Sequence, residues 1–279
     1  MRGMIARDFR KLLEGRWELG NFLCVGLDSE PEKIPQSARK ATVRDTIFSF
    51  NKQIIDATHD IVCAFKPNSA FYEAHGDGGL LALSDTVSYI HKVASDVPVI
   101  LDAKRADIGN TNDGYVEAVF DRLGMDALTV HPYLGREALE PFLARSEKGI
   151  IVLCKTSNPG AGEFQDMLVD GEPLYKIVAK HVSEKWNKNG NCGLVVGATY
   201  PDDLKKVRAI VGDMPILIPG IGAQGGDLER AVLAGKNSRG RGMIISVSRA
   251  VLFASDGSGF AGAAREKAIE LDSAIRKAI

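Results

Sequence analysis

The stretch Val97-Pro98-Val99-Ile100-Leu101-Asp102-Ala103-Lys104 has five apolar residues followed by two charged ones that flank an alanine. Apolar residues in unbroken succession, rather than in alternation, are typical of a β-strand buried on both faces. Seven further runs share this character, and longer amphipathic stretches separate most of them. These runs are Phe22–Asp28, Ile61–Pro67, Ala127–Tyr133, Gly149–Thr156, Cys192–Thr199, Pro215–Gly222 and Met243–Arg249. The alternation of strand and helix predicts a parallel sheet with right-handed crossovers.

The amphipathic stretches between the runs predict the helices. In Val43–Ala57, for example, the apolar residues recur at helical spacing and form one stripe. Ser84 is expected to mark the start of the second helix, and Pro201 with two following aspartates the start of the sixth. The remaining predicted helices are Leu81–Val93, Tyr115–Leu123, Glu137–Leu143, Leu174–Trp186, Asp202–Ile210, Asp227–Leu233 and Ala263–Ile275.

Eight strand–helix units are the number that closes into a (β/α)₈ barrel, the TIM barrel. An open doubly wound sheet is the alternative, but no G-x-G-x-x-G turn opens the first helix. No linker or low-complexity tract divides the 279 residues, and the irregular segments, among them Asn158–Gly171, read as loops of the barrel. We therefore expect one α/β barrel domain over residues 1–279, with a short helical extension at the N-terminus.

Charge and composition exclude several classes of protein. Lys and Arg number 35 against 36 Asp and Glu, and this balance argues against binding nucleic acid or anionic membranes through bulk charge. No apolar run approaches the roughly 20 residues of a membrane span, and the first 16 residues lack the apolar core of a signal peptide. The four cysteines lie in apolar runs without a C-x-x-C pair, a pattern typical of reduced thiols. We therefore expect a cytoplasmic protein without nucleic-acid or membrane partners.

Charged residues follow the apolar part of the second and third runs. Asp102 and Lys104 are two residues apart, so on a regular strand their side chains point to the same side, into the mouth of the barrel. Lys66 ends the preceding strand, and Asp107 follows in the next loop or first helical turn. Buried charges need partners, so these four predict an alternating network of lysine and aspartate. One interpretation is a salt-bridge network that only joins two strands; the other, which we favour, is a site that holds a protonated lysine as an acid.

A second cluster follows the seventh and eighth runs, where barrels of this type usually bind phosphate. The segment from Pro219 to Gly226 contains four glycines, whose backbone N–H groups could approach phosphate oxygens. Ser248 and Arg249 end the eighth run, and the arginine offers a bidentate ion pair. A flexible turn beside a surface arginine is the alternative. No H-E-x-x-H, clustered His/Cys ligands or Walker A motif is present, so no metal is predicted.

The segment from Asp102 to Thr111, D-A-K-R-A-D-I-G-N-T, closely resembles the D-x-K-x-x-D-I-x-x-T motif of the orotidine 5′-phosphate decarboxylase family. The resemblance extends over nearly the whole chain and includes Val25–Asp28, Phe65–Asn68, the Pro219–Gly222 loop and Ser248-Arg249. The length and the Phe65–Glu73 stretch are similar to the longer bacterial subgroup. The resemblance implies a TIM barrel that converts orotidine monophosphate (OMP) to uridine monophosphate (UMP) and CO₂ in pyrimidine biosynthesis, without a cofactor.

The resemblance also implies a role for each matching residue. Lys104 protonates C6 of the pyrimidine after CO₂ leaves, and Asp102 and Asp107 flank the substrate carboxylate, with Lys66 completing the network. Asp107, Ile108 and Thr111 come from the neighbouring subunit, which makes the enzyme a homodimer with two shared sites. The implied substrate contacts are Asp28 and Lys66 for the ribose, Ser157 or its neighbour Thr156 for the pyrimidine, Gly222, Gln224 and Arg249 for the phosphate, and Pro219 and Ser248 nearby.

Three other functions remain open at this point. A metal-dependent sugar-phosphate lyase, such as a 3-keto-gulonate phosphate decarboxylase or hexulose phosphate synthase, shares the D-x-K-x-x-D spacing. Lys66 stands where such a metal site would prefer a carboxylate, which argues against it. A Schiff-base aldolase needs an unprotonated lysine, whereas neighbouring aspartates keep a lysine charged. A non-catalytic nucleotide-binding protein would have no need of clustered carboxylates beside its ligand.

Overall fold

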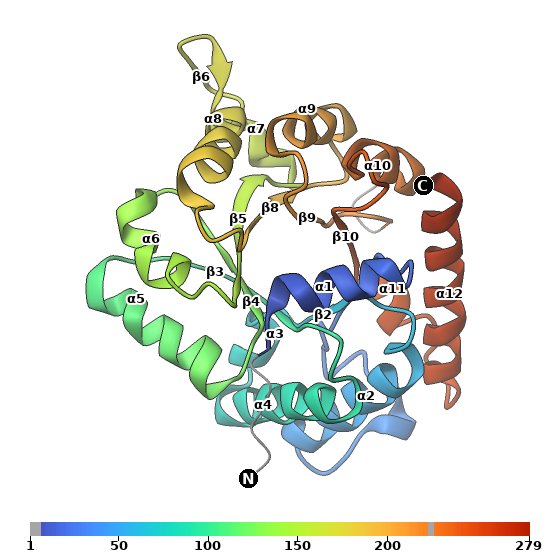
Figure 1. Cartoon of the computed structure of the whole chain (residues 1–279). Helices are drawn as coiled ribbons and strands as arrows, with labels where there is room; N and C mark the ends of the chain where they lie inside the picture. Colours follow the sequence, from blue (N-terminus) through green and yellow to red (C-terminus); the bar gives the residue numbers. More distant parts are fainter. Residues whose placement is uncertain (1–6, 223–225) are drawn as a thin grey trace.

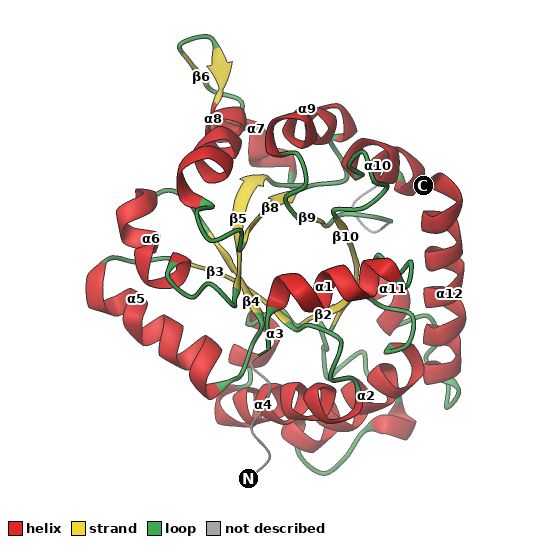
Figure 2. Ribbon diagram, viewed as in Figure 1, coloured by secondary structure: helices red, strands yellow, loops and turns green. Residues whose placement is uncertain are grey.

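The computed structural model of the chain describes residues 7–222 and 226–279. Figures 1 and 2 show a ring of helices around a central set of strands. Eight parallel strands form one sheet, in the order β2-β1-β10-β9-β8-β5-β4-β3. Their bounds are β1 Leu23–Gly26, β2 Ala64–Lys66, β3 Ile100–Arg105, β4 Ala127–Val130, β5 Gly149–Lys155, β8 Cys192–Val196, β9 Ile216–Ile218 and β10 Met243–Val247. Each lies within, or one residue beyond, a predicted apolar run.

The sheet closes into a barrel where β2 meets β3. This seam has no continuous ladder; instead two isolated parallel bridges join Phe65 to Val99 and Asn68 to Asp102. Backbone N–H groups of Asp102 and Ser69 donate across it, to Pro67 at 2.9 Å and to Asp102 at 3.2 Å. The predicted (β/α)₈ TIM barrel is therefore confirmed. The seam lies beside Lys66 and Asp102, the residues that the sequence placed at the barrel mouth.

Helices cover the outside of the barrel, and most match the predicted stretches. Two predicted helices continue as π-helical turns, η2 Glu117–Arg122 after α5 and η4 Val182–Trp186 after α8. The α-helices of the barrel wall are α2 Val43–Thr58, α4 Gly76–Val93, α5 Gly109–Val116, α6 Gly135–Leu143, α8 Leu174–His181, α9 Pro201–Val211, α10 Leu228–Gly235 and α12 Phe260–Ala278. Shorter pieces are α3 Ala70–Glu73, α7 Gly162–Gln165, α11 Arg249–Leu252, η1 Gln36–Ala38 and η3 Pro159–Ala161.

The predicted start of the second helix at Ser84 is wrong. Helix α4 begins at Gly76, so Ser84 lies in its interior. Its first turn contains three glycines, which are poor helix formers and concealed the start from the sequence pattern. Packing explains one of them: a Cβ on Gly79 would lie 2.0 Å from the carbonyl oxygen of Tyr72. Close contact with the preceding segment therefore outweighs helix propensity here.

The segment predicted as the irregular loop Asn158–Gly171 contains regular structure. Besides η3 and α7, it includes β6 Leu168–Val169, which pairs antiparallel with β7 Glu172–Pro173. The two-residue turn is Asp170-Gly171, and both residues have positive φ, 52° and 81°. Asp-Gly is a strong signal for this kind of turn, so the sequence did contain the information. The strands were missed because each has only two residues.

The N-terminal helix α1 Phe9–Glu18 lies across the end of the barrel that holds the strand N-termini (Figure 1). Phe9, Leu13 and Trp17 are buried, and the Trp17 indole donates to the carbonyl of Met243 at 2.8 Å. The helix therefore covers the bottom of the barrel and leaves the opposite mouth as the place for a site. The four cysteines are free and buried, as predicted, and a search of the described residues found no helix suited to span a membrane.

Candidate active site

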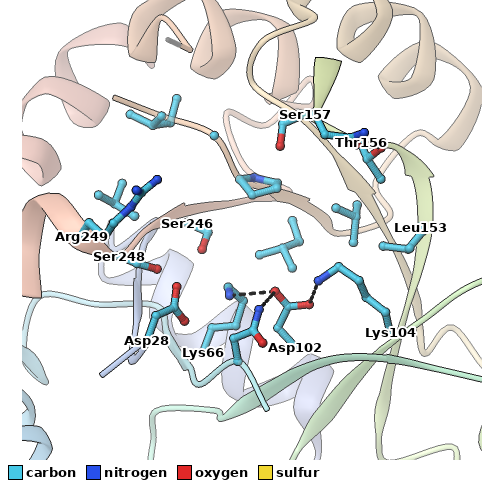
Figure 3. Close-up of a pocket in the computed structure, with 18 of the residues that line it drawn as sticks. Asp28, Lys66, Asp102, Lys104, Leu153, Thr156, Ser157, Ser246, Ser248 and Arg249 are labelled. Atoms are coloured by element: carbon cyan, nitrogen blue, oxygen red, sulfur yellow. Dashed lines mark hydrogen bonds and ion pairs between the residues drawn. The ribbon is translucent and has the colours of Figure 1, made fainter. Parts of the chain in front are cut away.

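A cavity of about 350 Å³ lies at the mouth of the barrel, where the strand C-termini converge. Figure 3 shows Asp28, Lys66 and Asp102 along one side, Thr156 and Ser157 across from them, and Arg249 and Lys104 at opposite ends. The lining residues are Asp28, Lys66, Asn68, Asp102, Lys104, Leu153, Thr156, Ser157, Asn158, Val195, Leu217, Pro219, Gly220, Ile221, Ser246, Val247, Ser248, Arg249 and Ala250. Such an elongated arrangement suits a ligand with different chemical groups at its two ends.

Asp102 is the centre of the charged cluster. Its Oδ1 accepts from the Lys104 ammonium at 2.7 Å and from the Thr129 hydroxyl at 2.9 Å. Its Oδ2 accepts from the Lys66 ammonium at 3.1 Å and from the Asn68 amide at 3.4 Å. The carboxylate therefore has two donors on each oxygen and is fixed in orientation. Thr129 and Asn68 were not predicted as part of this cluster.

The pKa values of the cluster favour its charged forms. Burial by itself would raise the pKa of Asp102, but the charges of Lys66 and Lys104 outweigh burial and hold it well below its usual range. Lys66 is only 4% exposed, and burial by itself would lower its pKa. The negative charges of Asp102 and Asp28 reverse that effect and raise it. The cluster thus keeps two charged groups in a buried setting because each stabilises the other.

Lys104 reaches Asp102 by an unusual backbone conformation. Its φ is +50°, a left-handed value that costs a non-glycine residue roughly 1–2 kcal/mol. The pairing of β3 with β4 shifts register between Leu101 and Arg105, so simple alternation along a regular strand does not apply. The Thr129 hydroxyl accepts from the backbone N–H groups of Ala103 and Lys104, both at 3.0 Å, and holds this turn. The expected meeting of Asp102 and Lys104 is confirmed, but a bulge produces it.

The structure does not bring Asp107 into the cluster within one chain. Its Oδ1 accepts from the backbone N–H of Ile108 at 2.7 Å. Ile108 is 60% exposed and Thr111 is exposed. None of these three residues lines the cavity described above. The alternating four-membered network expected from the sequence is therefore wrong for a single chain, in which Asp102 binds Lys66 and Lys104 while Asp107 bonds within its own loop.

Three of the ligand-binding residues predicted after β9 and β10 line the cavity. Pro219, Ser248 and Arg249 line it, and Arg249 makes no ion pair within residues 7–222 and 226–279. Gly222 follows in the loop with φ +73°, and Gln224 lies outside the described residues. The Ser248 side chain needs Gly26 beneath it, since a Cβ there would lie 1.9 Å from its hydroxyl oxygen.

The hydroxyl groups of Thr156 and Ser157, on the opposite wall of the cavity, differ in their hydrogen bonds. The Thr156 hydroxyl donates to the Asn158 side chain at 2.6 Å and accepts from Gln165 at 2.9 Å. The side-chain hydroxyl of Ser157 makes no hydrogen bond within the described part of the chain. Of the two, Ser157 therefore has the hydroxyl without a hydrogen bond to the described residues.

Asp28 lies near Lys66 on the ligand side. Its Oδ1 is buried and has no hydrogen-bond partner among the described residues. A buried carboxylate oxygen without a donor is rare, and a ligand hydroxyl would satisfy it. Asp28 therefore suits recognition of a hydroxyl group.

Part of the cavity wall is apolar, and the sequence did not reveal it as part of a site. Leu153, Val195 and Leu217 contribute from β5, β8 and β9, and Val247 from β10. In the sequence these residues look like any others in a buried strand. Only the closure of the barrel decides which strand residues face the cavity. An apolar wall beside a charged cluster suits a planar ring with a polar substituent.

Comparisons with known proteins agree with this geometry. A model of the orotidine 5′-phosphate decarboxylase / HUMPS family matches residues 21–263. The chain belongs to this family. A protein named orotidine 5′-phosphate decarboxylase from Cupriavidus metallidurans is 50% identical over 270 residues, covering 96% of this chain and 98% of that protein. One of the same name from Cellvibrio japonicus is 49% identical over 272 residues, covering 97% and 99%.

Solved structures lead to the same family. The structure of Leishmania donovani OMP decarboxylase superposes with a TM-score of 0.83 at 38% identity, covering 97% of this chain and 99% of that chain. The family and the fold that the D-x-K-x-x-D-I-x-x-T motif implied are thus confirmed. Membership of the orotidine 5′-phosphate decarboxylase / HUMPS family argues against a non-catalytic binding protein. The closure of the sheet between β2 and β3 excludes the open doubly wound sheet.

Proposed function

We propose that this chain catalyses the cofactor-free decarboxylation of OMP to UMP and CO₂ in pyrimidine biosynthesis, with Lys104 as the acid that protonates C6. The observation that carries the proposal is the Lys104 ammonium, held 2.7 Å from the ionised Asp102 in a cavity with an apolar wall. A cation fixed in such a setting stabilises negative charge that develops nearby.

The bonds and charges of this step balance. The bond from C6 to the carboxylate carbon breaks, CO₂ departs, and the electron pair stays on C6. The Lys104 ammonium faces this developing carbanion, stabilises it and transfers one proton to it. Asp102 holds the ammonium in place and adds negative charge where the substrate carboxylate lies, which favours its departure as neutral CO₂.

The rest of the cavity accounts for the rest of the nucleotide. We assign the phosphate to Arg249, Ser248, Pro219 and Gly222, together with Gln224, because anions bind readily to arginine and to glycine-rich loops. Asp28 and Lys66 contact the ribose, and the Oδ1 of Asp28, which has no partner in the described part of the chain, supports this role. Ser157 contacts the pyrimidine ring.

We also propose a homodimer in which Asp107, Ile108 and Thr111 complete the site of the partner subunit. The position of these residues outside their own cavity supports this. Two further apolar side chains on the next loop, Tyr133 and Leu134, are exposed by 89% and 43%. Apolar residues exposed together on one rim are typical of a protein interface. Mixing the inactive variants Lys104→Ala and Asp107→Ala should restore activity through hybrid sites; no recovery would contradict shared sites.

We further propose that the whole chain acts as one barrel domain in the cytoplasm. The four free, buried thiols support a reducing compartment.

One assay tests the activity: the loss of OMP absorbance with a metal chelator present. Lys104→Ala should lower kcat by about 10²–10⁴, the usual contribution of an acid catalyst, and leave UMP binding measurable. Lys11→Ala, on an exposed side chain of α1, is the matched control and should retain full activity. Turnover of Lys104→Ala within tenfold of the wild type would show that another group supplies the proton.

A further inference from the structure

Lys155, the last residue of β5, is a fully buried lysine that the proposed chemistry does not use. Its ammonium forms an ion pair with Asp166. The ring centroids of Tyr200 and Tyr175 lie 4.7 Å and 5.5 Å from it, within the range of cation–π contacts. In the described part of the chain, Asp166 is the sole carboxylate paired with this ammonium.

Asp166 itself does not belong to the barrel. It follows α7 in the segment after β5, and half of its side chain is exposed to solvent. Its neighbour Gln165 binds the residue after β5 twice: the amide oxygen accepts from the Thr156 backbone N–H, and the amide nitrogen donates to the Thr156 hydroxyl, both at 2.9 Å. Two consecutive residues of the segment are thus attached to two consecutive residues at the end of β5.

The ion pair opposes movement of the segment away from β5. If the segment moved away, Asp166 would go with it, and a buried ammonium would keep only two aromatic faces as partners. Removing one partner of a buried ion pair is strongly unfavourable because the other charge is left uncompensated. The buried Lys155 therefore favours the arrangement in which the segment lies on β5.

The residues that follow β5 connect the position of this segment to the ligand cavity. Thr156 and Ser157 follow Lys155 directly and line the cavity. Ser157 fits closely, since a Cβ on Gly197 would lie 2.7 Å from its Cα. The Thr199 hydroxyl donates to the Ser157 carbonyl at 3.3 Å and the Tyr200 hydroxyl to that of Asn158 at 3.4 Å. The wall that faces the base is thus fixed on one side by Tyr200, which also contacts Lys155.

We propose that Lys155 is a positioning residue: through Asp166 it holds residues 158–166 against the end of β5 and so fixes Ser157 for contact with the pyrimidine ring. This rests on the proposed function, because Ser157 is assigned to the base there. The specific consequence is that the ion pair supports recognition of the base and leaves recognition of ribose and phosphate unchanged.

The first test measures the segment itself and does not depend on catalysis. In Asp166→Asn, amide hydrogen exchange of peptides within 158–169 should accelerate at least tenfold, and by more than that of peptides from the barrel strands. Asp166→Glu, which keeps the carboxylate, should restore most of the protection. Asp170→Asn is the matched control, since Asp170 lies in the same segment and makes no ion pair among the described residues. Exchange unchanged in Asp166→Asn would overturn the proposal.

The second test separates the base from the rest of the nucleotide. Asp166→Asn should weaken UMP binding about tenfold by calorimetry, with ribose 5-phosphate binding within twofold of the wild type. Lys155→Met should act in the same direction. Equal losses for both ligands, or no loss for UMP, would overturn the positioning role. If wild-type protein instead failed to decarboxylate OMP, the proposed function would fail, while the exchange result would still decide whether the ion pair holds the segment.

Discussion

Asp126, at the opposite end of the barrel from the cavity, connects Arg7, which precedes α1, to the start of β3. It is fully buried, and Arg7 binds it through two hydrogen bonds of 2.8 Å, from Nε and from Nη2. Its Oδ2 also accepts from the backbone N–H of Val99 at 2.8 Å, one residue before β3. Since β3 carries Asp102 and Lys104 at its other end, this carboxylate fixes the base of the strand that carries the proposed acid.

The expected effect on stability follows from its pKa. Burial by itself would raise the pKa of Asp126, but contacts with His91 and Arg7 outweigh it and lower the pKa from 3.8 to about 2. That difference corresponds to about 2.4 kcal/mol of unfolding free energy, at about 1.36 kcal/mol for each tenfold ratio. Because the folded-state pKa is lowered, the contribution is complete above pH 4–5 and is lost as the pH falls toward 2. By pH 3 about 1.1 kcal/mol of it is lost.

The perturbation is Asp126→Asn, compared with the wild type by urea unfolding at pH 7, 5, 4 and 3. The variant should be less stable by about 2.4 kcal/mol at pH 7, and this difference should shrink by about 1.1 kcal/mol at pH 3. Asp96→Asn is the control: Asp96 also pairs with an arginine of the N-terminal region, Arg16 of α1, but is 63% exposed, so its effect should stay below about 1 kcal/mol. A difference between Asp126→Asn and the wild type that stays constant from pH 7 to pH 3 would refute the reasoning.

Three further predictions concern the cavity, the rim and the thiols. Arg249→Ala should lower kcat/KM for OMP by about 10–100-fold, because one charge-assisted hydrogen bond is worth about 1.5–3 kcal/mol. Turnover of orotidine, which lacks the phosphate, should hardly change. Equal losses on both substrates would show that Arg249 does not bind the phosphate. Tyr133→Asp, at an 89% exposed position, should raise the dimer dissociation constant at least tenfold by sedimentation and keep the helical circular dichroism; an unchanged constant would remove this rim from the interface. Burial raises the pKa of the Cys24 thiol to about 12, so this thiol should react with Ellman's reagent only after unfolding, and fast labelling of the native protein would contradict its burial.

Much of the cavity could be predicted because strand ends are visible in a sequence. Asp28, Lys66 and Arg249 each follow an apolar run, and parallel strands in a barrel bring such positions to one rim. Leu153 and Val195 escaped notice because a residue that faces the ligand and one that faces a helix look the same in a buried strand. Thr129, a single hydroxyl within an apolar run, was a signal that could have been used.

Unbroken apolar runs for the strands and an apolar period of 3.6 residues for the helices were enough for the sequence to determine the eightfold repeat and thus the barrel. The sequence also determined the chemical types at the mouth, since a local motif holds Asp102, Lys104 and Asp107. Only the tertiary structure decided which of them meet: a bulge and the Thr129 hydroxyl bring Lys104 to Asp102, while Asp107 turns away. It also decided that Lys155 pairs with Asp166. Such pairings depend on strand register and barrel closure, which bring together residues distant in the chain. Neither produces a periodic pattern in the sequence.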